Sequence, residues 1–129
     1  MTTDLEKRIT NTYRSKGEKT IAKFLNQYGL SFVYETDIYL QDKNKSYIWH
    51  PDFYLPKYHT IIEYFGMNGD KKYDQLTQRK KRIYYDNNYH LIPVYEKTLK
   101  KDYQTYILKS LYDNQKNKLT NLQRKFEYK

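Results

Sequence analysis

Apolar residues recur every three to four positions in several stretches of the chain, and this spacing predicts amphipathic helices. The predicted helices cover residues 3–13, 15–28, 70–87 and a C-terminal region from Thr98 onward. Gly29 is expected to end the second helix, because glycine readily adopts the left-handed conformation found after a helix. In the C-terminal region, Leu119, Leu122 and Phe126 either extend one helix or form another.

Short runs of β-branched and aromatic residues lie between the helical stretches and predict strands. These runs cover residues 30–35, 36–40, 47–49, 59–65 and 89–95, with a turn at 41–46. The early strands follow one another closely and favour an antiparallel meander. The last strand follows a helix, which favours a right-handed crossover with one parallel pairing. We therefore expect an αβββαβ arrangement of the α/β class, with a mixed four- to five-stranded sheet flanked by helices.

Two acidic residues, Asp52 and Glu63, are embedded in segments that otherwise have the composition of covered strands. Carboxylates are rarely buried in such segments unless they are paired or hold a metal ion. If adjacent strands bring the two acids together, their oxygens form a site of the kind that Mg²⁺ prefers. The alternative is structural: Asp52 makes a turn after Pro51, and Glu63 faces water at a strand end.

A third acid, Glu18, lies on the apolar side of its predicted helix and has two interpretations that do not exclude each other. A free carboxylate is costly on such a face, so Glu18 can serve as a further site residue. The segment Ser15-Lys16-Gly17-Glu18 also has the spacing of a capping box, in which the glutamate folds back on the helix start.

The helix predicted over residues 70–87 carries a lysine at the centre of its inner face. Counted at helical spacing, that face consists of Tyr73, Leu76, Thr77, Lys80, Ile83 and Tyr84. A lysine in this position must either extend to solvent or meet an acid. Lys81 and Arg82 point away from the centre of the face.

The length and charge of the chain limit the classes of function. Its 129 residues suit one domain, with a core over about residues 15–96 and a helical extension over about 97–129. A net charge of +9 favours a polyanionic partner such as nucleic acid, although plain solubility is the simpler explanation. The absence of cysteine excludes disulfides and fits a reducing interior. No apolar run has the length of a membrane span, so we expect a soluble protein without a membrane partner in the cytoplasm of a bacterium or virus-infected cell.

The ordered set S-x-G-E, F-x-Y-E, P-D-F and I-I-E-Y-F-G resembles the PD-(D/E)XK, or restriction-endonuclease-like, nuclease superfamily. The resemblance spans roughly residues 15–95. Within the superfamily, the chain is similar to small phage and bacterial endonucleases, including phage junction-resolving endonuclease I. It implies a metal-dependent DNA endonuclease that uses Mg²⁺, with Mn²⁺ as a substitute. Asp52 matches the PD aspartate, Glu63 the acid of the second motif, and Glu18 a helix-borne metal ligand.

One position departs from this pattern: Phe65 stands where the lysine of E-x-K belongs. Either catalysis has been lost, or the lysine has moved to another element. The resemblance to variants with the lysine on the following helix implies that Lys80 is catalytic, with Lys81 as the fallback.

The leading hypothesis is therefore a Mg²⁺-dependent endodeoxyribonuclease that hydrolyses phosphodiester bonds, structure-selective or junction-resolving cleavage being among the open specificities. One alternative is a catalytically inactive nucleic-acid-binding module on the same fold, and another is a small regulatory protein whose basic charge is incidental. Cleavage of both duplex strands favours a homodimer, since symmetric substrates suit twofold partners. The residues that we assign to nucleic-acid contacts are Lys81, Arg82, Lys16, Arg14, Lys57 and His50.

Overall fold

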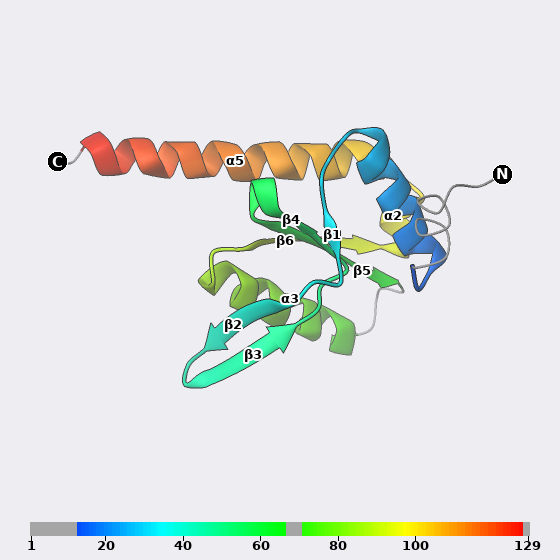
Figure 1. The fold of residues 1–129 in the computed structure, drawn as a ribbon, viewed down its shortest axis with the longest axis horizontal. Coiled ribbons are helices and arrows are strands. Elements are labelled where there is room, and N and C mark those ends of the chain that lie inside the picture. Colours follow the sequence, from blue (N-terminus) through cyan, green and yellow to red (C-terminus); the bar gives the residue numbers. More distant parts are fainter. Residues whose placement is uncertain (1–12, 67–70, 128–129) are drawn as a thin grey trace.

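The computed structural model describes residues 13–66 and 71–127, so the helix expected over residues 3–13 lies almost wholly outside the described residues. In chain order the elements are α2 (Lys16–Gln27), β1 (Val33–Tyr34), β2 (Ile38–Asp42), β3 (Lys45–Trp49), β4 (Phe53–Leu55), a 3-10 turn (Pro56–Tyr58), β5 (Thr60–Gly66), α3 (Lys71–Asp86), β6 (His90–Tyr95), α4 (Glu96–Leu99) and α5 (Tyr103–Glu127). Figure 1 shows their arrangement.

The main sheet has four strands in the order β1-β4-β5-β6. The pairings of β1 with β4 and of β4 with β5 are antiparallel, whereas β6 lies parallel to β5. The expected mixed sheet with one parallel pairing is therefore confirmed. Helix α3 connects the two parallel strands, as the strand–helix–strand pattern predicted.

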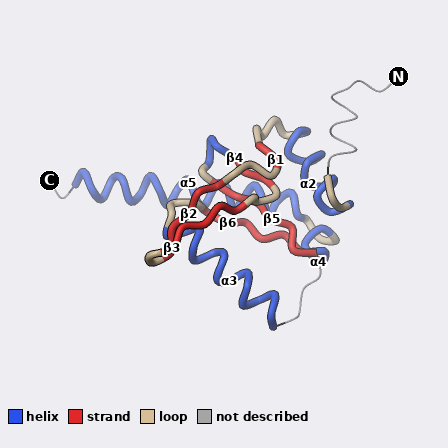
Figure 2. Tube along the Cα trace, turned by 60° about the horizontal axis from the view of Figure 1, so that its bottom comes forward, coloured by secondary structure: helices blue, strands red, loops and turns tan. Residues whose placement is uncertain are grey.

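Helices cover both faces of this sheet. Helices α2 and α5 lie on one side, while α3 and the hairpin β2–β3 lie on the other (Figures 1 and 2). Each side has its own apolar cluster. The first includes Ile21, Leu25, Phe53, Ile62, Val94 and Ile107, and the second includes Ile38, Leu40, Ile61, Ile83 and Tyr84. Alternate residues of β5 enter the two clusters, as the period of two along a strand requires.

The continuous meander expected over residues 30–49 is wrong in two respects. Strand β1 contains only two residues, and β2 pairs with β3 in a separate two-stranded sheet. The turn predicted at 41–46 is also shorter, because the two strands extend to Asp42 and from Lys45. Lys43 takes the left-handed conformation, with φ of 58°, that a two-residue hairpin turn requires. A lysine gave no sequence signal for such a turn.

The boundaries of α2 follow the expected chemistry. The hydroxyl of Ser15 accepts a hydrogen bond from the Glu18 N–H at 3.1 Å and caps the first turn. At the other end, Gly29 has φ of 67°, and the Leu30 N–H donates to the Leu25 carbonyl at 2.8 Å. This is the hydrogen bond of a Schellman motif, and it confirms that Gly29 ends the helix.

The helical phase of α3 is as predicted at most positions. Thr77, Ile83 and Tyr84 are buried, and Lys80 is half-buried. Leu76 is a wrong prediction because it is 43% exposed, so the covered face is narrower at this end of the helix than the spacing indicated. The side chain of Tyr73 lies outside the described residues.

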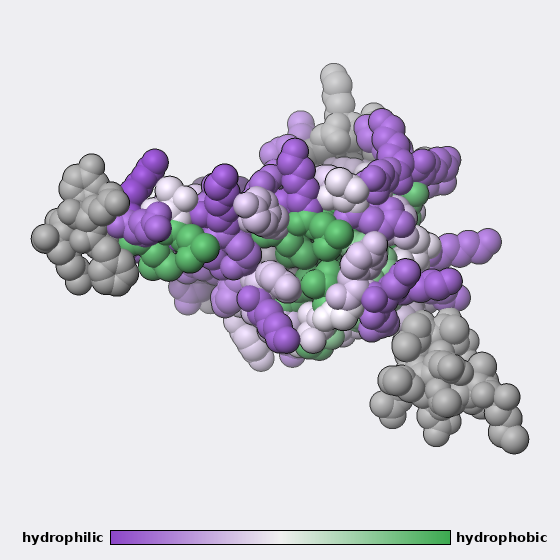
Figure 3. All heavy atoms as spheres, turned by 90° about the horizontal axis from the view of Figure 1, so that it is seen from above, coloured by the Kyte–Doolittle hydropathy of each residue, from purple (hydrophilic) through white to green (hydrophobic). Residues whose placement is uncertain are grey.

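The C-terminal region forms the short helix α4 and then one continuous helix, α5, of 25 residues. Ile107 and Leu111 anchor the first half of α5 in the core, while Leu119 and Leu122 extend the same helix and remain exposed. On the face viewed in Figure 3, most side chains are hydrophilic and apolar ones form separate patches. Among the described residues, no helix is long and apolar enough to cross a membrane.

Candidate active site

Asp52, the residue before β4, and Glu63, in the middle of β5, lie next to each other across two paired strands. Phe53 is aligned with Ile62 in the antiparallel pair β4–β5, so the residue before one and the residue after the other are adjacent across the sheet. The Tyr64 N–H donates to Asp52 Oδ2 at 2.7 Å, which fixes the Asp52 carboxylate against β5. The sheet therefore brings together the two acids that the sequence singled out.

Glu63 is 7% exposed, and both of its carboxylate oxygens accept hydrogen bonds from α3. Lys80 Nζ lies 3.1 Å from Oε2, and the Tyr84 hydroxyl lies 3.2 Å from Oε1. The expected approach of the Lys80 ammonium to the acids is thus present. Lys81 is exposed on the outer side of the helix. The helical phase predicted from sequence, which put Lys80 and not Lys81 on the inner face of α3, agrees with the contact between Lys80 and Glu63.

Two aromatic rings also surround the Lys80 ammonium. Its Nζ lies 5.6 Å from the ring centre of Phe65 and 6.0 Å from that of Trp49. Cations are attracted to aromatic faces at such distances. Phe65 and Trp49 therefore provide a favourable environment for the Lys80 ammonium.

Glu18 is 5% exposed and occupies the N-terminal turn of α2. Its Oε1 accepts from the Tyr34 hydroxyl at 2.7 Å, and its Oε2 accepts from the Ser15 hydroxyl at 3.0 Å. Ser15 caps the helix, as one interpretation required, while the carboxylate is directed toward Tyr34 of β1. Burial is the main cause of the raised pKa of Tyr34, and the hydrogen bond to the Glu18 carboxylate raises it further.

The position next to Glu18 allows α2 to approach β5 closely. A Cβ atom added to Gly17 would overlap the ring of Tyr64. Only glycine leaves room for this contact. Tyr64 thus contacts α2 through its ring and Asp52 through its backbone N–H.

Asp52 differs from an ordinary exposed aspartate because its pKa is raised. Burial raises the pKa of Asp52 to about 7, the hydrogen bond from Tyr64 opposes this shift, and the negative charges of Glu18 and Glu63 add to it. Lys80 lowers the pKa by a smaller amount than these effects. Among the described residues, the nearby cation Lys80 has too small an effect to offset the desolvation of the ionised Asp52 carboxylate.

The chemistry of these donors fits a hard divalent cation. Across residues 13–66 and 71–127, no three His, Asp or Glu side chains form a group that could hold a metal ion, so the expected set of Glu18, Asp52 and Glu63 is not assembled as one. Mg²⁺, however, is commonly bound by one or two carboxylates together with water and substrate phosphate oxygens, without a closed protein cage. Asp52 and Glu63 supply that number of carboxylates, and the raised pKa of Asp52 shows where positive charge would stabilise the fold.

A polar pocket of about 390 Å³ opens beside Asp52 and is lined by Arg14, Glu35, His50 and Asp52. Arg14 Nε lies 2.8 Å from Glu35, and His50 Nε2 lies 2.7 Å from Asp37. The two predicted nucleic-acid contacts at this site, Arg14 and His50, are therefore paired with acids in this structure. Both pairs are accessible to solvent, where ion pairs exchange partners at little cost.

The other predicted nucleic-acid contacts are distributed around the molecule. Lys16, Lys57 and Lys81 are exposed on α2, the 3-10 turn and α3. Arg82 differs, because it forms ion pairs with Asp42 at 3.1 Å and with Asp86 at 3.4 Å. This side chain connects α3 to the hairpin β2–β3.

Sequence reasoning missed the aromatic partners of the acids. Tyr34 binds Glu18, Tyr84 binds Glu63, and Trp49 contacts Lys80. Tyr84 was expected on the inner face of α3, which was a usable signal for its contact with a buried strand. With seventeen tyrosines in the chain, composition alone could not distinguish the two that bind carboxylates.

No protein-family model, curated protein or solved structure matches this chain.

Proposed function

We propose that this protein is a Mg²⁺-dependent endodeoxyribonuclease with a restriction-endonuclease-like core. The observation that carries the proposal is the arrangement of Asp52 and Glu63 on adjacent strands with Lys80 donating to Glu63 at 3.1 Å. Phosphodiester hydrolysis requires carboxylates for metal binding and a cation close to the reacting phosphate. The net charge of +9 supports a polyanionic substrate.

In this proposal each residue has a distinct task. Asp52 and Glu63 hold the cation, which when bound lowers the pKa of water and neutralises charge on the phosphate. Lys80 orients the attacking water or stabilises negative charge on the phosphate oxygens. Glu18, which is hydrogen-bonded to Tyr34, adds negative charge that acts on Asp52. Arg14 and His50, at the mouth of the pocket, contact the phosphate backbone.

One observation favours a second candidate, a DNA-binding module without catalysis. Both oxygens of Glu63 already accept hydrogen bonds, from Lys80 and Tyr84. A buried acid so satisfied can be purely structural. The two candidates make the same prediction for DNA binding and opposite predictions for cleavage.

The deciding experiment is a cleavage assay with the purified protein on linear duplex, branched and single-stranded DNA, with Mg²⁺, Mn²⁺ or a chelator. We expect cleavage of at least one substrate with either metal and none with the chelator. Asp52→Asn should abolish cleavage, while Asp113→Asn, which removes an exposed acid on α5, should cut at the wild-type rate. Salt-sensitive binding of every substrate without cleavage would instead establish the non-catalytic module.

The homodimer remains part of the proposal, because cleavage of both strands of a symmetric duplex favours two active sites related by a twofold axis. Sedimentation of the protein with and without DNA tests it, and a complex containing two protein copies is expected on a substrate with twofold symmetry.

A further inference from the structure

The hairpin β2–β3 lies on the same side of the main sheet as α3, and its tip projects beyond the body in the view of Figure 1. Its inner face contributes Ile38 and Leu40 to the second apolar cluster. The strands are paired without a bulge from Ile38–Trp49 to Asp42–Lys45. The hairpin is therefore a regular two-stranded ribbon that is anchored on one face.

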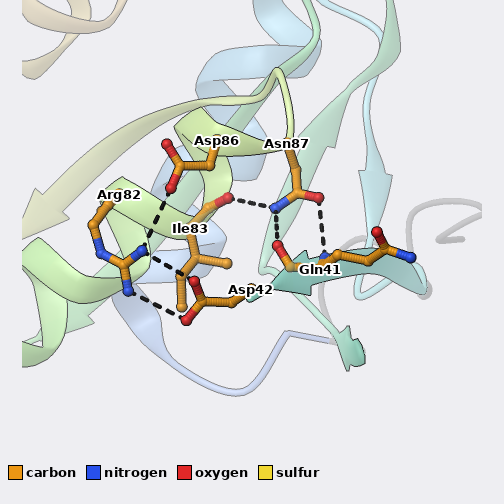
Figure 4. Close-up of polar contacts among 6 residues, drawn as sticks. All are labelled: Gln41, Asp42, Arg82, Ile83, Asp86 and Asn87. Atoms are coloured by element: carbon orange, nitrogen blue, oxygen red, sulfur yellow. Dashed lines mark hydrogen bonds and ion pairs between the residues drawn. The ribbon is translucent and has the colours of Figure 1, made fainter. Parts of the chain in front are cut away.

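Polar contacts hold this ribbon rigidly on α3 (Figure 4). The Arg82 guanidinium binds both oxygens of Asp42, at 3.1 and 3.3 Å. The Asn87 side chain donates to the Gln41 carbonyl at 2.9 Å and accepts from the Gln41 N–H at 3.0 Å. Asn87 also donates to the Ile83 carbonyl at 2.7 Å, which fixes its own orientation. A ribbon held in this way would lose little conformational entropy on binding a partner.

The outer face of the ribbon is uncovered and has a mixed composition. Tyr39 and Ile48 form a cross-strand pair and are 71% and 53% exposed. The next outward pair toward the tip, Gln41 and Ser46, is also exposed and carries polar side chains. The exposed strip thus consists of an apolar pair followed, toward the tip, by a pair with amide and hydroxyl groups.

The tip and one side of the ribbon are basic. Lys43 and Lys45 are exposed at the turn, and the exposed Arg79 of α3 lies with its guanidinium 5.9 Å from the ring centre of Tyr47. Asp42 is the acid at this end, and Arg82 neutralises it and lowers its pKa. The accessible charge at the tip is therefore positive, which suits an anionic partner.

The base of the ribbon reaches the candidate active site. Trp49, the last residue of β3, lies against the Lys80 ammonium, and the chain then continues through His50 to Asp52. A polymer bound along the ribbon would consequently pass from Lys43 at the tip to the carboxylates at the base.

We propose that the outer face of the hairpin β2–β3 binds in the major groove of duplex DNA next to the position that is cut. The inference rests on the proposed nuclease function and assigns its substrate-binding surface. The major groove, about 12 Å wide, admits a two-stranded ribbon. Lys43 and Lys45 contact phosphates, and the strip of Gln41, Ser46 and Ile48 faces the base edges. Amide groups and aliphatic side chains are suited to adenine and to the thymine methyl group respectively.

The test measures DNA binding in the Asp52→Asn background with a chelator, so that cleavage plays no part. The variant Lys43→Asn/Lys45→Gln removes two charges at the tip, and asparagine tolerates the left-handed backbone at position 43. Its matched control, Lys23→Gln/Lys109→Gln, removes two exposed charges from α2 and α5 on the opposite side of the sheet. We expect the tip variant to bind duplex about tenfold more weakly, with a salt slope reduced by about 2. The control should bind as the parent does.

Protection of guanine N7 from methylation reports occupancy of the major groove. We expect protection by the parent protein, and a changed pattern for Gln41→Ala/Ile48→Ala without a change in the salt slope. Equal losses of affinity in the tip and control variants, or unprotected guanines, would overturn the assignment. A change in oligomeric state of the tip variant with DNA affinity intact would assign the hairpin to a protein interface instead.

Failure of this inference is distinguishable from failure of the nuclease proposal. If the wild type cuts DNA and the tip variant binds normally, the hairpin assignment is wrong and the nuclease proposal stands. If the wild type never cuts while the tip variant loses affinity and groove protection, the hairpin binds DNA and the catalytic proposal fails.

Discussion

Glu18 and Glu63 are buried to almost the same extent, 5% and 7% exposed, yet the structure stabilises their charges in different ways. Glu63, on β5, receives a lysine ammonium and a tyrosine hydroxyl from α3. Among the described residues, Glu18 of α2 accepts hydrogen bonds from the neutral hydroxyls of Tyr34 and Ser15. Hydrogen bonds satisfy the oxygen atoms in both cases, but within the described part of the chain Glu63 is the one of the two acids that is paired with a cation.

Both acids affect the charge of Asp52. Burial is the main cause of its raised pKa, the negative charges of Glu18 and Glu63 raise it further, and the single lysine opposes the shift by a smaller amount. A cation from solution would restore the balance. The predictions that follow test this asymmetry, from the largest expected effect to the smallest.

Removing either of the acids that the proposal assigns to the metal should have the largest effect. We expect Asp52→Ala and Glu63→Ala to reduce single-turnover cleavage by more than ~1000-fold, because each deletes a ligand that no neighbour can replace. DNA binding should persist, since neither acid contacts phosphate directly. Cleavage by Asp52→Ala at the wild-type rate in Mg²⁺ would show that the metal-site assignment is wrong.

Replacing the lysine that neutralises Glu63 should separate two neighbouring positions of α3. Lys80→Met has a similar volume and should fold and bind DNA, yet fail to cut. It should also unfold more easily, by about 1–2 kcal/mol, because it leaves a buried carboxylate without its cation. Lys81→Met is the matched control: it should bind DNA more weakly, with a smaller salt slope, and cut normally at saturating DNA. Reversed phenotypes would assign catalysis to Lys81.

Glu18→Gln tests whether the second buried acid matters for its charge or only for its hydrogen bonds. Glutamine can still accept from Tyr34, so stability in urea should change little. If the charge takes part in the site, cleavage should fall at least ~100-fold, equivalent to ~2.7 kcal/mol. A fully active Glu18→Gln protein would show that Glu18 has no part in cleavage and serves only at the start of the helix.

The pH dependence of stability should reveal the unbalanced charge at Asp52. Its pKa in the folded protein, about 7, lies above the ordinary value of 3.8, so folding favours the protonated acid. Wild-type stability should therefore fall as the pH rises through this interval and level off above it. Asparagine stays neutral, so Asp52→Asn should equal the wild type near pH 4 and exceed it by roughly 2–4 kcal/mol near pH 8.

Urea unfolding at several pH values measures this difference. Added Mg²⁺ should raise the stability of the wild type at the higher pH and leave Asp52→Asn nearly unchanged. A pH-independent difference between the two proteins would show that Asp52 is not desolvated as the structure indicates.

The sequence predicted best those features that depend on local periodicity or end signals. Ser15 and Gly29 marked the limits of α2, and the 3.6-residue period of α3 placed Lys80 on the side of Glu63. The separation of β2 and β3 from the main sheet was not predictable, because strand propensity does not specify which strands pair. The ion pair of Arg82 with Asp42 and the contact between Gly17 and Tyr64 join segments far apart in sequence, and no local signal indicates them.

Trp49 is the only tryptophan in the chain, and its ring lies against both Lys80 and Tyr84, with 5.2 Å between the centres of the two rings. The protein therefore contains its own optical reporter at the candidate active site. Red-edge excitation bypasses the seventeen tyrosines, so the emission of one indole can be followed without a label. Its intensity and wavelength depend on the charge and hydration of its surroundings, and titration with a divalent cation or DNA should change both.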